Sequence, residues 1–202
     1  MLDRYATALI RPAMTVAARV LVRAGIGANA VTLLGFAIGL LAAILIASGA
    51  YSAGAIAILV SRLCDGLDGA VARQTAATDA GGFLDITLDF VFYASIPLAF
   101  AVANSGANAL PAALLLAAFM GTGTSFLAFA VIAAKRGLTS LDYPDKSFYF
   151  LGGLTEATET LAFFIAMCLW PQHFALLATT FAGLCGITIV TRIVWGWRTF
   201  HN

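Results

Sequence analysis

Four aspartates occur in one short window of an otherwise apolar chain. They are Asp65, Asp68, Asp85 and Asp89. A carboxylate at bilayer depth costs about 2.5–3.5 kcal/mol even on the most lenient insertion scale, so it is kept where a cation, a polar cavity or a reaction needs it. This window is therefore the candidate functional site.

Helical spacing places the aspartates on two stripes, one before and one after a short turn. The first stripe consists of Asp65, Asp68, Gly69 and Ala72, and the second of Gly81, Asp85 and Asp89. Residues three, four, seven or eight apart lie on the same face of a helix. Two antiparallel helices joined by a tight turn can face these stripes toward each other, so we expect the four carboxylates to converge.

The residue types in the window predict a site for hard divalent ions. Four bare carboxylates would repel one another, and oxygen ligands without paired Cys or His favour Mg²⁺ or Mn²⁺. Two such ions about 3.5–4 Å apart can clamp the attacking and leaving oxygens of a phosphoryl transfer. Small residues along the stripes leave room for a bulky phosphate ester, and Arg73 can bind a phosphate oxygen. The small residues are Gly66, Gly69, Ala72 and Gly81.

Two other interpretations of the window were weighed. Ion pairs of Arg62 with Asp65 and of Arg73 with Asp68 would help a helix end to cross the interface, but they leave the other two aspartates without a role. A divalent-cation transporter or a non-catalytic membrane protein is the second alternative. A transport path needs polar groups through the whole membrane, and the outer halves of these helices are apolar. Charge gathered at one face favours an interfacial enzyme.

The composition predicts an all-α integral membrane protein. Of its 202 residues, 61% are hydrophobic and 10% are charged, and the mean hydropathy is +0.95. A helix needs roughly 20 apolar residues to span the bilayer. We expect six spans, at about 30–49, 53–73, 83–104, 109–134, 148–169 and 173–196. Residues 1–26 then form a cytoplasmic juxtamembrane helix, and residues 27–202 form one transmembrane catalytic domain.

The basic residues predict how the chain is oriented. Those outside the spans gather on one side of a six-helix path: Arg4, Arg11, Arg19, Arg23, Arg73, Lys135, Arg136, Lys146 and Arg198. The opposite connections contain no Lys or Arg. The positive-inside rule places both termini and the aspartate window on the cytoplasmic side of the cell (inner) membrane. Nucleic acid is excluded as a partner, because no basic patch interleaved with aromatics lies outside the membrane-flanking segments.

The N-terminal segment and the first span carry further signals. Arginines 4, 11, 19 and 23 fall within an arc of roughly 120° on a helix, which predicts an interfacial amphipathic helix bound to anionic membrane lipids. A lid over a cytoplasmic site is an additional role for this helix. Asn29 is expected to cap the first span. Gly35 and Gly39 form a Gly-x-x-x-Gly step, which favours close helix packing within a subunit.

The window resembles the signature of a known family. Asp-x-x-Asp-Gly-x-x-Ala-Arg, followed after a short gap by Gly-x-x-x-Asp-x-x-x-Asp, is the signature of the class I CDP-alcohol phosphotransferases, integral membrane enzymes of phospholipid synthesis. The segment Asn29-Ala30-Val31-Thr32 looks like the family's Pro-Asn-x-x-Thr step. Two details depart from the pattern: Ala28 replaces the proline, and residues 74–80 form a gap of seven where roughly eight is usual.

The resemblance implies roles for the residues of the window. Asp65, Asp68 and Asp85 would hold two Mg²⁺ or Mn²⁺ ions, with Asp89 completing the second ion and deprotonating the acceptor alcohol. The cytidine diphosphate site would be lined by Thr32, Asp65, Gly66, Gly69, Ala72, Arg73 and Gly81. The implied reaction transfers a phosphatidyl group from CDP-diacylglycerol to a small alcohol, such as glycerol 3-phosphate or an inositol phosphate, and releases CMP. A homodimer is also implied.

Acceptor recognition is expected in the remaining cytoplasmic half. The candidates are Lys135, Arg136, Lys146, Glu156, Glu159 and Arg192. The two glutamates are expected two to three turns inside the fifth span, where an ion pair with Arg192 is the alternative to substrate contact. The three loop residues are alternatively solvated charges of the positive-inside type.

Overall fold

The computed structural model describes residues 3–138 and 154–201, with residues 3–10 described by their backbone alone. Within these ranges the chain is helical and contains no strand, which confirms the all-α prediction. The elements are α1 (Asp3–Arg23), α2 (Ala28–Ala47), α3 (Tyr51–Gln74), α4 (Asp79–Ala103), α5 (Ser105–Lys135), α6 (Ala157–Leu169), the 3₁₀ turn η1 (Pro171–His173) and α7 (Phe174–His201).

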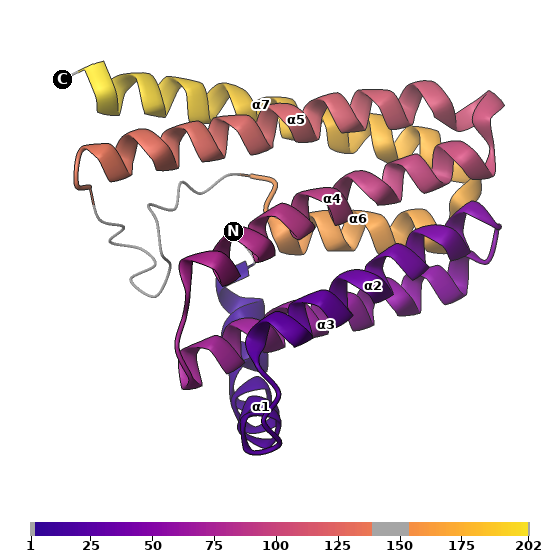
Figure 1. The fold of residues 1–202 in the computed structure, drawn as a ribbon. Helices are drawn as coiled ribbons and strands as arrows, with labels where there is room; N and C mark the ends of the chain where they lie inside the picture. The colour runs from indigo at the N-terminus through magenta and orange to yellow at the C-terminus, as the bar shows by residue number, and fades with distance from the viewer. Residues whose placement is uncertain (1–2, 139–153, 202) are drawn as a thin grey trace.

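The helices α2 to α7 run alongside one another, and α1 lies across their direction near the turn from α3 to α4 (Figure 1). Helix α2 packs against both α3 and α4, while α5 packs against α4 and α7, and α6 against α3 and α7. Fully buried aromatic side chains hold this arrangement together: Phe92, Phe100, Phe164, Phe174 and Phe181. Burial of such rings is the largest apolar contribution a side chain can make.

Four helices are long and apolar enough to cross a membrane: α2, α4, α5, and α7 together with η1. Helix α3 has sufficient length, but it carries the charged residues of the aspartate window. Helix α6 has 13 residues, and the rest of the expected span 148–169 lies largely outside the described residues. The chain is thus a membrane protein with at least these four candidate spans.

Two predicted helix starts are wrong. Helix α2 begins at Ala28 with Gly27 as its N-cap, so Asn29 lies inside the first turn and does not cap it. Helix α6 begins at Ala157, with Glu156 as N-cap and Glu159 in the first turn, so neither glutamate lies deep in a span. Their side chains form a reciprocal capping box with the main chain, which satisfies the amide groups that a helix start leaves free.

The Gly-x-x-x-Gly step packs within the subunit as predicted. A Cβ atom on Gly35 would lie 2.8 Å from the Cβ of Cys64 on α3, and one on Gly39 would lie 2.6 Å from the Phe92 ring on α4. Both glycines are therefore needed for α2 to approach its two neighbours. Direct backbone contact between α3 and α4 is sparse, so the two aspartate-bearing helices meet chiefly through side chains beside α2.

Helix α1 rests on the end of α3. Ala18 of α1 is fully buried in a small cluster with Ala70 and Val71 of α3. The side-chain amide of Gln74 also donates a hydrogen bond to the carbonyl oxygen of Thr15, at 3.0 Å. The apolar side of α1 is thus partly covered by protein. Its predicted contact with anionic lipid stays a prediction.

Candidate functional site

The site lies where α3 ends and α4 begins. Thr78 is in an extended conformation and caps α4, because its side-chain oxygen accepts a hydrogen bond from the amide of Gly81 at 3.1 Å. This cap fixes the start of α4, and with it the phase at which Asp85 and Asp89 leave the helix. Periodicity on α3 sets Asp65 and Asp68 in the same way.

Three of the four aspartates converge. Asp65, Asp68 and Asp85 each offer one carboxylate oxygen, and these oxygens lie within 4.8 Å of one another. Asp68 is 5% exposed, and its Oδ2 has no hydrogen-bond partner among the described residues. A buried carboxylate oxygen without a partner is costly, and a divalent cation with oxygen ligands would satisfy it. The donor set therefore fits a hard ion such as Mg²⁺ or Mn²⁺.

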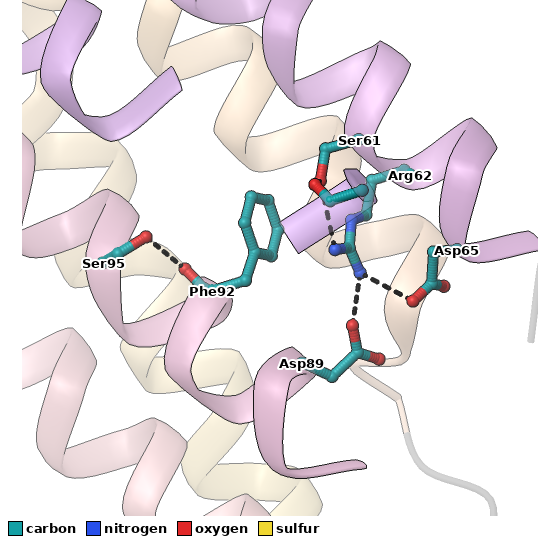
Figure 2. Close-up of polar contacts among 7 residues, drawn as sticks. Ser61, Arg62, Asp65, Asp89, Phe92 and Ser95 are labelled. Atoms are coloured by element: carbon teal, nitrogen blue, oxygen red, sulfur yellow. Dashed lines mark hydrogen bonds and ion pairs between the residues drawn. The ribbon is translucent and has the colours of Figure 1, made fainter. Parts of the chain in front are cut away.

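The fourth aspartate is paired with an arginine (Figure 2). Nη1 of Arg62 lies 2.6 Å from Oδ1 of Asp89 and 3.4 Å from Oδ1 of Asp65. Of the two ion pairs in the alternative interpretation, that of Arg62 with Asp65 is present, but Asp89 is the nearer partner. The other, Asp68 with Arg73, is not observed in this fully described part of the chain. The observed ion pairs of Arg62 therefore connect residues that line the pocket.

A small pocket opens over these carboxylates. Its lining consists of Thr32, Gly35, Phe36, Arg62, Asp65, Asp68, Asp85, Leu88 and Asp89. The predicted contribution of Thr32 from α2 is therefore consistent with its position. Ala72, one turn beyond Asp68 on α3, is partly buried and does not line the pocket.

The glycines of the window differ in the atoms that surround them. A Cβ on Gly66 would meet nothing within 4 Å, whereas one on Gly69 would lie 3.4 Å from Nη1 of Arg73. The Arg73 side chain thus lies beside Gly69, and its phosphate-binding role stays a prediction. At Gly81, a Cβ would lie 2.9 Å from Oδ1 of Asn29. Gly81 therefore makes room for a side chain of α2.

The acceptor candidates do not form one cluster. Arg192 is 9% exposed, and its Nη1 donates to the carbonyl oxygen of Thr122 on α5 at 2.9 Å. Arg136 donates to the carbonyl oxygens of Thr199 and Phe200 near the end of α7. Lys135 is exposed at the end of α5, and Lys146 lies outside the described residues. The acceptor candidates Glu156 and Glu159 are engaged in capping α6.

Sequence reasoning missed three residues that support the pocket. Ser61 is fully buried and donates a hydrogen bond to the carbonyl oxygen of Gly35 at 2.7 Å. The ring of Phe92 lies under the Arg62 guanidinium, and Thr78 caps α4. Only Thr78 had a signal in the sequence, because a threonine before an acidic first turn is typical of an N-cap.

Comparison with known proteins gives matches over most of the chain. The family model of the CDP-alcohol phosphatidyltransferases matches residues 26–195. The chain is 51% identical over 202 residues to "Inner membrane protein YnjF" of Escherichia coli (strain K12), covering 100% of this chain and 98% of that protein. It is 38% identical over 109 residues to a phosphatidylinositol phosphate synthase of Streptomyces avermitilis, covering 52% of this chain and 44% of the relative.

Solved structures share the fold. The phosphatidylinositol phosphate synthase of Mycobacterium tuberculosis with CDP-DAG bound has a TM-score of 0.73 and 24% identity, covering 91% of this chain and 93% of that chain. The same enzyme in complex with manganese and citrate also has a TM-score of 0.73, covering 91% and 88%. The likeness extends over nearly the whole of each chain, so the described helices are arranged as in those structures.

Proposed function

Because the chain belongs to the CDP-alcohol phosphatidyltransferase family, we propose that it transfers a phosphatidyl group from CDP-diacylglycerol to a small alcohol and releases CMP. The convergence of three carboxylates around a buried, unpartnered oxygen of Asp68 carries this proposal. The solved synthase structures support this proposal. One holds CDP-DAG, which supports the donor, and another holds manganese, which supports a divalent ion.

We assign the residues in and around the pocket different roles in the proposed reaction. Asp65, Asp68 and Asp85 would hold divalent ions, with Asp89 completing the second, and such ions would supply charge neutralisation at the phosphates. Arg73 binds a phosphate oxygen of the donor. Residues around it line the cytidine diphosphate site: Thr32, Asp65, Gly66, Gly69, Ala72 and Gly81.

Asp89 takes the proton of the acceptor hydroxyl. The acceptor oxygen then forms a bond to the phosphorus that bears the lipid, and the bond from that phosphorus to the CMP oxygen breaks. A base must lie within hydrogen-bond reach of the proton that it removes. This role is supported by the position of Asp89, which lines the same pocket as the three converging carboxylates.

The acceptor is proposed to be a phosphorylated alcohol, either glycerol 3-phosphate or an inositol phosphate. Its phosphate would contact Arg192 and the basic residues at the end of α5 and beyond, which are Lys135, Arg136 and Lys146. The similarity to phosphatidylinositol phosphate synthases favours the inositol phosphate. The glutamates Glu156 and Glu159 would act here by fixing the start of α6.

The membrane arrangement is part of the proposal. Helices α3 and α6 would complete six spans, with both termini and the pocket on the cytoplasmic side of the inner membrane. Basic residues at the pocket end of the bundle support this orientation, among them Arg23, Arg73 and Lys135. A homodimer, which the family resemblance implies, is proposed as the assembly.

The test uses purified protein in detergent micelles with labelled CDP-diacylglycerol and a panel of acceptors, with the lipid product identified by mass. We expect CMP release that depends on Mg²⁺ or Mn²⁺. The variants Asp85→Asn and Asp89→Asn should abolish release while remaining folded. Asp79→Asn is the matched control, since Asp79 is exposed in the first turn of the same helix. Full turnover by Asp89→Asn would overturn the mechanism, and metal flux into liposomes without CMP release would favour a transporter.

A further inference from the structure

Arg62 lies outside the family signature, yet it contacts two carboxylates of the pocket. Its side chain is 12% exposed, compared with 33% for Asp65 and 31% for Asp89. A buried guanidinium in a membrane protein is kept when its partners or its function require it. The sequence alone offered Arg62 only as an aid to the helix end.

Groups from two helices, α3 and α4, restrain the guanidinium (Figure 2). Nη1 contacts Asp89 at 2.6 Å and Asp65 at 3.4 Å, and Nη2 donates to Oγ of Ser61 at 3.3 Å. The Ser61 hydroxyl donates in turn to the carbonyl oxygen of Gly35 on α2. The Arg62 Cζ atom lies 4.0 Å from the centroid of the Phe92 ring, which is a cation–π contact.

This restraint acts on one oxygen of Asp89. A charge-assisted hydrogen bond of 2.6 Å is short and directional, so it fixes Oδ1 and with it the plane of the carboxylate. The other oxygen, Oδ2, is left for the reaction. Without this contact, the carboxylate would be freer to rotate about its side-chain bonds.

We propose that Arg62 is a positioning residue for the transfer: held by Ser61 and Phe92, it fixes one oxygen of Asp89 and leaves the other to face the ion site and the acceptor hydroxyl. This rests on the proposed function, in which Asp89 takes the acceptor's proton. Arg62 also places a fixed positive charge beside Asp65 and Asp89. That charge repels a divalent ion at the same carboxylates.

These two effects predict changes of opposite sign when Arg62 is removed. In Arg62→Met, kcat should fall by about 100-fold, because small misplacements of a reacting group cost that much. The KM for CDP-diacylglycerol should change much less. Binding of Mn²⁺, measured by electron paramagnetic resonance, should become tighter by about threefold or more, since a competing cation is gone. If Arg62 had only a structural role, its removal would lower kcat and weaken Mn²⁺ binding together.

Three further variants separate charge, geometry and packing. Arg62→Lys keeps the charge but not the planar fork, so Mn²⁺ affinity should stay near that of the wild type while kcat recovers only in part. Phe92→Leu should lower kcat by about tenfold by loosening the guanidinium. Phe100→Leu is its matched control, because Phe100 is equally buried on α4, with no contact to Arg62. It should leave kcat unchanged.

The possible results distinguish this proposal from the proposed function. A wild-type protein that releases no CMP with any acceptor contradicts the proposed function. Weaker or unchanged Mn²⁺ binding in folded Arg62→Met overturns the role of Arg62, whether or not the wild type turns over. Wild-type kcat in Arg62→Met, together with metal-dependent turnover by the wild type, overturns the positioning role alone. If Arg62→Met does not fold, Arg62→Lys and Phe92→Leu decide, and a wild-type kcat in both refutes the proposal.

Discussion

Two arginines are buried inside the helical bundle, and they are held by different kinds of partner. Arg62 on α3 contacts the carboxylates of Asp65 and Asp89 in an open pocket. Arg192 on α7 donates to a main-chain carbonyl of α5, that of Thr122, and faces the ring of Phe126 at 5.6 Å. An arginine tied to ionised side chains can exchange partners with a cation, whereas one tied to the main chain is fixed by the fold.

The difference indicates distinct roles in the proposed reaction. The carboxylates around Arg62 are the groups that would hold metal and move a proton, so Arg62 should affect the chemical step. Arg192 has one nitrogen committed to α5, and its Nε has no hydrogen-bond partner among the described residues. Its proposed role is to bind an anionic acceptor. We expect Arg62 to control kcat and Arg192 to control the acceptor KM.

The largest effect is expected at Asp68, whose buried Oδ2 has no hydrogen-bond partner among the described residues. Asp68→Asn should lower CMP release by about 1,000-fold or more, because a neutral amide cannot replace an ionised ligand of a hard ion. Binding of Mn²⁺ should weaken by at least about tenfold. Turnover and electron paramagnetic resonance measure the two effects on the same preparation. Unchanged Mn²⁺ affinity would remove Asp68 from the metal site.

A smaller and different effect is expected at Arg192. Arg192→Lys should raise the KM for a phosphorylated acceptor by about tenfold, the cost of one charge-assisted hydrogen bond. The kcat at saturating acceptor should stay near that of the wild type. Steady-state kinetics over an acceptor series give both constants. Arg198→Lys is the control, since Arg198 is exposed on the same helix. A fall in kcat with constant KM would erase the contrast with Arg62.

The parts of the fold that follow from local periodicity could be predicted. The stripes of α3 and α4 depend only on residues a few positions apart, so the convergence of Asp65, Asp68 and Asp85 was within reach of the sequence. The close approach of α2 was predictable from Gly35 and Gly39 in the same way. Apolar length and composition likewise revealed the four candidate spans.

The parts that depend on distant partners could not be predicted. Arg62 and Asp89 are 27 residues apart, and no spacing rule tells which carboxylate an arginine will select. The position of Glu156 and Glu159 was predicted wrongly for another reason. Two glutamates three residues apart fit a capping box as well as an interior helix face. Because the surrounding segment is apolar, it predicted a span that continues through the two glutamates. The start of α6 was therefore placed too early.

Helix α2 packs against α3 and α4, the two helices that carry Arg62 and its partners. Gly39→Ala should destabilise the protein by about 1–3 kcal/mol, because the new Cβ would lie 2.6 Å from Phe92 and 2.9 Å from Oγ of Ser61. Both residues hold Arg62, so kcat should fall as well. Thermal unfolding in detergent measures the stability. Gly183→Ala on α7 is the control, since a Cβ there meets nothing within 4 Å, and it should be neutral.

The smallest effect is expected at the caps of two consecutive helices. Thr78 caps α4 beside the pocket, and Asn104 caps α5 at the opposite end of α4 by accepting from the amide of Ala107 at 3.3 Å. Replacing either residue by alanine should cost about 1 kcal/mol, since each loses one side-chain cap.

Only one of these two losses should reach the reaction. Thr78→Ala frees the first turn of α4 and with it the phase of Asp85 and Asp89, so its kcat should fall by a fewfold. Asn104→Ala loosens a turn remote from the pocket and should leave kcat unchanged at the same loss of stability. Thermal unfolding and CMP release, measured on both variants, test this. An unchanged kcat in Thr78→Ala would mean that local fraying at the start of α4 does not reach the carboxylates. The restraint of Asp89 by Arg62 would then suffice to hold Asp89.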